Sequence, residues 1–305
     1  MVTNSRFTEQ VRLLVTVLPH VARQGCFALK GGTALNLFIR DMPRLSVDID
    51  LAYLPVQDRE TSLRSIDQAL KAIAEDIARA VPGVNVNGST LSGTAAWFKF
   101  VVERGGMRVK VEVTPVLRGS VYSSELRELV PRAQAEFGYA QMQVLSFEDL
   151  YAGKLCAALD RQHPRDLFDV RLLLAGEGIT PRLKDAFLVY LLSHNRPMAE
   201  LLAPTRKDIE AIYTGEFSGM AVAPVTLEAL YDTREEMIAT IQRVLTEQNR
   251  RFLLAVKRGD ADWSTFPIPE AKDLPAVRWK LHNLSLMEQD KRQRALQALE
   301  RVLYG

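Results

Sequence analysis

The sequence predicts an α/β (α+β) protein, with a mixed β-sheet in its N-terminal half and an α-helical C-terminal half. Alternating apolar residues, which are typical of half-buried strands, occur at 47–54 and in three runs between residues 84 and 114. From about residue 147 onward, apolar residues recur every three or four positions, as they do in amphipathic helices. The length of 305 residues fits two domains, and we expect these at 1–145 and 146–305.

The N-terminal half begins with a predicted amphipathic helix at 7–23, followed by a short apolar strand and a break at Gly31-Gly32. Thr33 is a plausible cap for a short helix after this break. Residues 117–141 show no clear pattern. The remaining elements that we predict in this half are a strand at 47–54, a helix at 58–80, and strands at 84–90, 95–103 and 107–114.

The C-terminal half is predicted to be almost wholly helical. The segment 259–285 contains Pro267, Pro269 and Pro275, and we expect it to be a loop or linker. Helical spacing predicts helices at 147–160, 165–175, 181–194, 205–213, 226–257 and 286–303.

Composition and charge exclude several classes of protein. Hydrophobic residues make up 47% and charged residues 25%, which is the range of ordinary globular proteins. The net charge of +2 argues against binding nucleic acid by bulk charge alone, although a local basic groove remains compatible with it. Cys26 and Cys156 are far apart and the four histidines do not cluster, which argues against a structural zinc site. With no long apolar run and no signal pattern, we expect a soluble, cytoplasmic protein.

The stretch from Lys30 to Leu51, KGGTALNLFIRDMPRLSVDIDL, is the most informative part of the sequence. Two glycines allow backbone amides to approach an anion without obstruction by a Cβ atom. Asp48 and Asp50 lie two positions apart on a predicted strand, so their carboxylates share one face about 7 Å apart. Paired carboxylates attract hard cations such as Mg²⁺, and a metal beside a phosphate cradle suits phosphoryl or nucleotidyl transfer. Taken separately, a Gly-Gly pair is usually only a turn, and two aspartates that alternate on a strand are about as often a solvated sheet face as a site.

Three segments of the chain carry a resemblance to a known family. The Gly-Gly-Thr turn followed by RLSVDIDL (44–51) resembles the nucleotidyltransferase superfamily of DNA polymerase β, and more narrowly the AbiEii/AbiGii toxin family. The second matching block is LSFEDLYAGKLCAALDRQHPRDLFDVRLL (145–173), and a weaker third is LPAVRWKLHNL (274–284). Together they span most of the chain from about residue 25 to 285.

The resemblance implies a bacterial toxin of a type IV toxin–antitoxin or abortive-infection system. Such a toxin would be a nucleotidyltransferase that uses Mg²⁺ or Mn²⁺ to transfer a nucleotide from an NTP to RNA, such as the 3′ end of tRNA, and so blocks translation. Its antitoxin would be encoded nearby, usually as a transcriptional regulator. The N-terminal half would be the polymerase-β-like core, and the helical half would complete the nucleotide site and contact the substrate.

The resemblance also implies roles for particular residues. Asp48 and Asp50 would hold the metal, with Glu112 as a candidate third carboxylate, and Lys154 would contact phosphate. One of Asp166 and Asp169 would act as a base or hold Lys154 in place, and the other could be a charge at the N-terminus of a helix; the sequence does not choose between them. The residues implied to bind the nucleotide phosphates, besides Lys154, are Lys30, Gly31, Gly32, Thr33, Arg44 and Ser46.

Each of these roles has a simpler alternative. Lys154 could extend to solvent from an apolar helix, Arg44 could be an exposed loop residue, and Glu112 could pair with Lys110 or Lys99. The whole protein could instead modify a protein or small molecule, or be a catalytically inactive binding module. Basic residues that could contact RNA, or form an ordinary charged helix face, are Arg243, Arg250, Arg251, Lys257, Arg258, Lys291, Arg292, Arg294 and Arg301.

Overall fold

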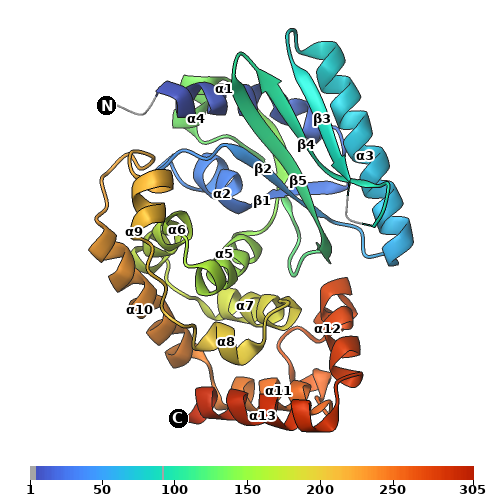
Figure 1. The fold of residues 1–305 in the computed structure, drawn as a ribbon, viewed down its shortest axis with the longest axis vertical. Coiled ribbons are helices and arrows are strands. Elements are labelled where there is room, and N and C mark those ends of the chain that lie inside the picture. Colours follow the sequence, from blue (N-terminus) through green and yellow to red (C-terminus); the bar gives the residue numbers. More distant parts are fainter. Residues whose placement is uncertain (1–4, 91–92) are drawn as a thin grey trace. The chain divides into compact units, whose positions relative to one another are not determined.

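The computed structural model describes residues 5–90 and 93–305, which form two compact units. The first unit comprises Met1–Leu150 and Ser218–Pro224, and the second comprises Tyr151–Phe217 and Val225–Gly305. A short segment from the C-terminal half of the sequence therefore belongs to the first unit. Figure 1 shows the helices and strands in the colours of the sequence.

The described residues of the first unit contain a seven-stranded mixed sheet, which confirms the predicted fold class. Its order is β3-β4-β5-β2-β1-β7-β6, so that β2, the strand with the two aspartates, lies at the centre. β2 is parallel to β5 and β1 is parallel to β7, while the other neighbours are antiparallel. The strands are β1 (Phe27–Lys30), β2 (Asp48–Tyr53), β3 (Asn85–Thr90), β4 (Trp97–Arg104), β5 (Met107–Arg118), β6 (Glu125–Glu128) and β7 (Gln141–Val144).

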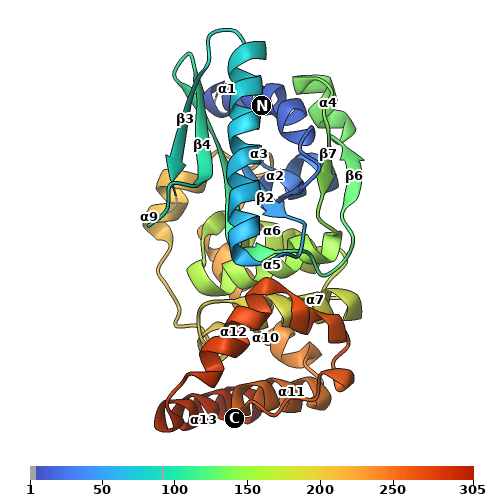
Figure 2. The ribbon, with the colours of Figure 1, turned by 90° about the vertical axis from the view of Figure 1, so that its right-hand side faces the viewer.

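Helices of the first unit pack against this sheet. α1 contacts β5 and β7, while α3 contacts β3 and β4 and also packs against α1. Figure 2 shows α3 running beside β3 and β4. Ile49 on β2 and Val111 on β5 are fully buried. The residues on either side of each, which point to the opposite face of the sheet, are polar, as the alternation predicts. The helical elements are α1 (Ser5–Ala22), α2 (Gly31–Ala34), the π-helical turn η1 (Leu35–Ile39), α3 (Arg59–Ala80) and α4 (Pro131–Phe137).

The segment 117–141, which showed no clear pattern, contains β6, α4 and the start of β7. These two strands have four residues each, and a period of two is hard to recognise over so short a run. β6 lies at the edge of the sheet and is mostly exposed. Only β7 shows a buried alternation, through Met142 and Val144.

The second unit is built from helices. The long helix α5 begins before the boundary between the units, which follows Leu150, and most of it belongs to the second unit. The elements are α5 (Phe147–Arg161), α6 (Pro164–Ala175), α7 (Pro181–Ser193), α8 (Met198–Leu202), α9 (Glu210–Ile212), the π-helical turn η2 (Tyr213–Phe217), α10 (Leu227–Val244), α11 (Glu247–Arg258), the 3₁₀ turns η3 (Trp263–Thr265) and η4 (Pro269–Asp273), α12 (Pro275–Ser285) and α13 (Gln289–Tyr304).

The helix predicted at 226–257 is two helices. The backbone is extended at Leu245, and α11 starts anew with a capping box in which Thr246 Oγ1 accepts from the Asn249 amide and Asn249 Oδ1 accepts from the Thr246 amide, both at 3.2 Å. This reciprocal pair satisfies amides that otherwise lack a helical partner. A continuous apolar spacing across the break concealed it in the sequence.

Two other predictions in this half were wrong for local reasons. Residues 205–209 are not helical, because the side chain of Gln162 bonds the carbonyl of Thr205 (2.8 Å) and the amide of Lys207 (3.0 Å) and so replaces helical hydrogen bonds. The expected loop at 259–285 contains two 3₁₀ turns and α12. Pro269 and Pro275 each occupy the first turn of such an element, where a missing amide proton costs little.

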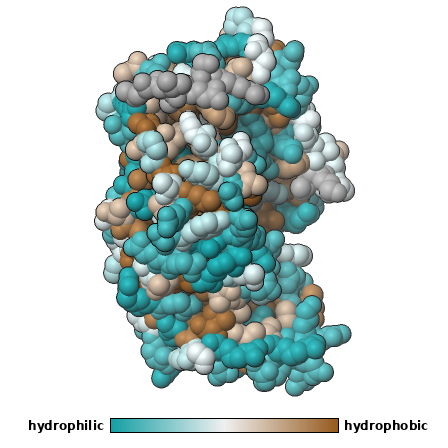
Figure 3. Space-filling model, turned by 60° about the vertical axis from the view of Figure 1, so that its left-hand side comes forward, coloured by the Kyte–Doolittle hydropathy of each residue, from teal (hydrophilic) through white to brown (hydrophobic). Residues whose placement is uncertain are grey.

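Apolar side chains form the interior of each unit, with Leu14, Leu18 and Val113 fully buried in the first and Leu155 and Leu188 in the second. On the face shown in Figure 3, hydrophilic residues predominate and apolar residues appear in smaller areas. No helix within the described ranges is long and apolar enough to cross a membrane.

Candidate functional site

The central strand β2 presents two carboxylates on one face of the sheet. Asp48 and Asp50 are half-buried, with Ile49 fully buried between them. Because β2 and β5 are parallel and in register, Asp48 lies opposite Lys110 and Asp50 lies opposite Glu112. Side chains opposite each other in a sheet share a face. The predicted carboxylates Asp48, Asp50 and Glu112 therefore lie on the same face, and Lys110 lies among them.

Lys110 provides a positive charge among these acids. Its Nζ lies 2.6 Å from Glu112 Oε2. Partial burial would lower the pKa of Lys110, but the hydrogen bond that Lys110 donates to Glu112 and the charges of Asp48, Glu112 and Asp50 outweigh this effect and raise it. Lys110 is therefore protonated at neutral pH and offsets part of the negative charge. Glu112 thus forms an ion pair with Lys110, which is the alternative to a catalytic role that the sequence left open.

The two carboxylates on β2 suit a metal ion that is also bound by the phosphates of a substrate. Within residues 5–90 and 93–305, no group of three His, Cys, Asp or Glu side chains is arranged to hold a metal ion. Asp48 and Asp50 remain a pair of oxygen donors on one strand face. Mg²⁺ in enzymes that act on nucleotides is commonly held by one or two carboxylates together with substrate phosphates and water. The two aspartates fit that arrangement and do not form a complete cage.

Gly31 and Gly32 lie directly against side chains that the sequence also singles out. A Cβ atom at Gly31 would lie 2.6 Å from Asp50 Oδ2, and Gly31 has a positive φ of 73°. A Cβ atom at Gly32 would lie 2.9 Å from both Arg44 Nη2 and Ser46 Oγ. Only glycine leaves room for this approach at both positions. The fold thus brings together Gly31, Gly32, Arg44, Ser46 and Asp50.

Thr33 joins the glycine turn to β2. Its hydroxyl lies 2.5 Å from the carbonyl oxygen of Asp48 and 3.0 Å from Ser46 Oγ. One hydroxyl has one proton, so we infer that Thr33 donates to the carbonyl and accepts from Ser46. Thr33 is 1% exposed and does not cap α2, whose N-cap residue is Lys30. Lys30 pairs with Asp50 in the antiparallel register of β1 and β2.

Arg44 is 2% exposed, so it is not the solvent-exposed loop residue of the alternative interpretation. Its Nη1 donates to the carbonyl of Leu45 at 2.9 Å. The backbone around it is held by Ser218–Pro224, since Leu45 donates to the Met220 carbonyl (3.1 Å) and Val222 donates to the Pro43 carbonyl (2.9 Å). Sequence reasoning missed this segment, because it lies about 175 positions away and has no distinctive motif.

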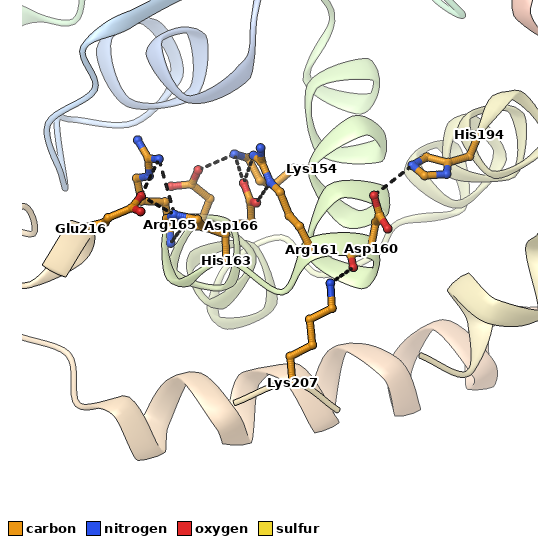
Figure 4. Close-up of polar contacts among 10 residues, drawn as sticks. Lys154, Asp160, Arg161, His163, Arg165, Asp166, His194, Lys207 and Glu216 are labelled. Carbon is orange, nitrogen blue, oxygen red and sulfur yellow. Dashed lines mark hydrogen bonds and ion pairs between the residues drawn. The ribbon is translucent and has the colours of Figure 1, made fainter. Parts of the chain in front are cut away.

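In the second unit, Lys154 on α5 bonds both aspartates of α6. Figure 4 shows Lys154 beside Asp166. Its Nζ lies 2.9 Å from Asp166 Oδ1 and 2.9 Å from Asp169 Oδ2. The side chains of these three residues are 6%, 1% and 2% exposed, respectively. Lys154 therefore does not extend to solvent. Asp166 and Asp169 are one helical turn apart, which places both carboxylates within reach of one amino group.

Arg161, which the sequence analysis did not select, forms a second bond to Asp166. Its Nε lies 2.5 Å from Asp166 Oδ2 and its Nη2 lies 3.0 Å from Oδ1, in a bidentate arrangement. Lys154 and Arg161 are seven positions apart on α5, and this two-turn spacing on one helix face was the available signal. Burial alone would raise the pKa of Asp166, but Lys154 and Arg161 outweigh it and hold that pKa well below its usual range.

The electrostatic setting of Asp166 bears on the two roles considered for it. A general base works best when its pKa lies near the operating pH. Asp166 is ionised, buried and bonded to two cations, so it is a poor proton acceptor and a good group for holding Lys154 in place. Of the two roles left open by the sequence, the geometry favours the second for Asp166.

His163 has a structural position at the start of α6. It is the N-cap residue, and its Nδ1 accepts from the Arg165 amide at 3.1 Å. Nε2 lies 3.1 Å from Glu216 Oε2. Figure 4 shows these two residues side by side. Burial lowers the pKa of His163, although Glu216 opposes this effect. A neutral ring that accepts at Nδ1 and donates at Nε2 satisfies both contacts.

Comparisons with known proteins support the fold class and the family that the sequence resembles. The fold is similar to that of MenT4, a nucleotidyltransferase toxin from Mycobacterium tuberculosis H37Rv, with a TM-score of 0.61 and 17% sequence identity over 98% of this chain and 94% of that one. No curated protein sequence matches the chain. The family model of the nucleotidyl transferase AbiEii toxin, type IV toxin–antitoxin system, matches residues 12–283. The chain therefore belongs to the AbiEii family of nucleotidyltransferase toxins of type IV toxin–antitoxin systems.

Proposed function

We propose that this toxin transfers a nucleoside monophosphate from an NTP to an RNA acceptor, with the 3′ end of tRNA as its target, and thereby blocks translation. The observation that carries the proposal is the close packing of Gly31 and Gly32 against Asp50, Arg44 and Ser46. This arrangement combines unobstructed backbone, a cation, a hydroxyl and a carboxylate, which together suit a metal-bound triphosphate.

Each residue of this group has a distinct role in the proposal. Asp48 and Asp50 hold Mg²⁺ or Mn²⁺, which when bound neutralises the triphosphate and lowers the pKa of the attacking hydroxyl. Gly31 and Gly32 let the backbone approach the phosphates, and Ser46 and Arg44 bond their oxygens. We assign Thr33, Lys30 and Lys110 to positioning and charge balance, because Thr33 is bonded to β2, Lys30 is in register with Asp50, and Lys110 is paired with Glu112.

We propose that Lys154 of α5 also acts in this reaction. An ammonium group stabilises the charge that develops as the phosphorus–oxygen bond breaks. Asp166 and Asp169 hold this group at 2.9 Å each, so its position is set before substrate binds. Pre-positioned charge costs no reorganisation during the reaction. We propose that the toxin acts in the cytoplasm and is countered by an antitoxin encoded next to it as a transcriptional regulator.

Labelled nucleotides test the activity directly. The full chain is incubated with each of four α-labelled NTPs, Mg²⁺ and total RNA, and the label is followed into RNA, protein and small molecules. We expect label at the 3′ end of tRNA, and none after chelation of divalent metal. Label in protein or in a small molecule, or absence of any metal-dependent transfer, would contradict the proposed acceptor or the proposed activity, respectively.

A matched pair of variants tests the site. Asp48→Asn removes one charge from the proposed metal ligands and is expected to abolish transfer and growth inhibition. Glu75→Gln makes the same acid-to-amide change at an exposed position on α3 and is expected to leave both unchanged. Equal activity of the two variants would refute the role of Asp48.

A further inference from the structure

Lys257, in the last turn of α11, is a buried lysine without a partner. It is only 7% exposed, and no hydrogen bond or ion pair reaches its amino group from the described parts of the chain. Its basic neighbours on α11 differ, since Arg251 pairs with Glu247 and Arg258 with Asp260. Lys257 Nζ is not among the fully buried polar atoms that lack a partner, so the apolar stem is buried while the ammonium group reaches solvent and is accessible to an anion.

The charged groups nearest to Lys257 are also positive. Burial lowers the pKa of Lys257, and Arg292 and Lys291 of α13 lower it further. Burial also lowers the pKa of Lys280 of α12, to about 8, with Lys257 as the second cause. No acidic side chain is among the groups that shift either pKa within the described residues. Residues of α11, α12 and α13 therefore bring together cations that have no carboxylate partner within the described residues.

Neutral backbone oxygens hold these cations in place. Lys280 Nζ donates to the carbonyls of His194 (2.6 Å) and Arg196 (3.0 Å). Arg292 donates to the carbonyls of Leu284 and Arg258, and its Nε is buried without a partner. Carbonyl contacts fix the position of a cation and leave most of its charge uncompensated.

Helix capping accounts for only part of this arrangement. Arg292 bonds carbonyls at the C-terminal ends of α11 and α12, which is a favourable place for a cation. Capping does not explain Lys257, which bonds no carbonyl within the described residues and lies close to two other cations. An anion bound between these groups would offset the repulsion and complete the hydrogen bonds.

We propose that Lys257, Lys280 and Arg292 form a phosphate-binding subsite that takes a backbone phosphate of the RNA acceptor. That the bound phosphate belongs to RNA rests on the proposed function, whereas the affinity of the subsite for phosphate does not. Of the basic residues considered from sequence, the subsite includes Lys257 and Arg292, and it adds Lys280, which that set did not contain. Phosphate contacts of this kind position a nucleic acid without reading its sequence.

The first test measures the binding of total tRNA to the full chain at 50 and 200 mM KCl. Lys257→Met keeps the length and the apolar stem of the side chain and removes the charge. Losing one phosphate contact reduces the salt slope by about one, so wild type and variant should differ about threefold more at 50 mM than at 200 mM. Lys272→Met, the same change at an exposed lysine of η4, should leave the slope unchanged. Equal slopes for all three proteins would overturn the subsite as an RNA contact.

The second test uses inorganic phosphate and thermal unfolding, and does not depend on RNA. Phosphate should raise the melting temperature of wild type more than chloride does at equal ionic strength, and this difference should shrink in Lys257→Met. Without phosphate, Lys257→Met should melt no lower than wild type, because methionine keeps the buried apolar stem and removes a charge that Arg292 and Lys291 repel. Loss of phosphate stabilisation with an unchanged RNA slope would reassign the subsite to free phosphate and overturn the RNA contact. An unchanged phosphate response would refute the anion site, whatever the acceptor of the transferase.

Discussion

Gly31→Ala separates the catalytic geometry of the glycine turn from its backbone strain. The substitution has two effects, because Gly31 has a φ of +73° and its Cβ would lie 2.6 Å from Asp50 Oδ2. Gly83 has the same φ of +73° with nothing within 4 Å of its Cβ position. Gly83→Ala therefore carries the strain alone, and comparing the two variants isolates the displacement of Asp50.

The magnitudes follow from these contacts. An alanine at a left-handed position costs about 1–2 kcal/mol, so both variants should lose about that much free energy of unfolding. To restore an ordinary contact of 3.4 Å, the Asp50 carboxylate must move by about 0.8 Å. A misplacement of about 1 Å in a catalytic site can reduce the rate on the order of 100-fold. We therefore expect a loss of nucleotide transfer of that order in Gly31→Ala and almost none in Gly83→Ala.

Two assays decide the outcome. Urea unfolding measures the free energy of both variants, and label transfer at saturating NTP and RNA measures the rate. If Gly31→Ala retained wild-type transfer while losing the expected stability, the carboxylate of Asp50 would not need its position beside the turn. If Gly83→Ala lost transfer as well, backbone strain or partial unfolding would explain both results.

Two further predictions concern the buried ion pairs of the second unit. Lys154→Met should lower the free energy of unfolding, measured in urea, by about 3–5 kcal/mol. The reason is that Asp166 and Asp169, which are 1% and 2% exposed, lose this cation. A loss no larger than that of Lys272→Met would show that the two ion pairs contribute little to stability. The pKa of Asp166 is lowered by folding, so its ion pairs stabilise the protein fully above the unfolded pKa of about 3.9, and this contribution is lost as the pH falls through that value towards the folded one. When the pH is lowered from 6 to 3.5, the free energy of unfolding should therefore decrease less in Asp166→Asn than in wild type. An identical pH dependence of the two proteins would contradict this.

Local patterns in the sequence predicted much of the fold and part of the candidate site. The alternation at 47–54 was enough to place Asp48 and Asp50 on one strand face, because side-chain direction in a strand depends only on position parity. The helical spacing likewise predicted α3 and α7 to within about a residue. The break at Thr246 was missed, because apolar spacing continued across it while a capping box ended one helix and began another.

The sequence left open the roles of residues whose contacts lie on other helices. Lys154 could have extended to solvent, and its buried bonds to Asp166 and Asp169 depend on how α6 packs beside α5. Lys257 looked like one basic residue among many until its burial and the absence of a partner in the described residues set it apart. Burial and pairing are properties of the packed interior, and a residue's type alone does not determine them.

The sequence by itself determined the mixed α/β class, the paired aspartates on one strand face and the motifs of the family, because each depends on residues close together in the chain. Only the tertiary structure decided that Gly31 lies against Asp50, that Gly32 lies against Arg44 and Ser46, and that Ser218–Pro224 holds the Arg44 loop. The physical reason is that such contacts join segments far apart in sequence, and they form only when the packing of the whole unit offsets the entropy of bringing those segments together.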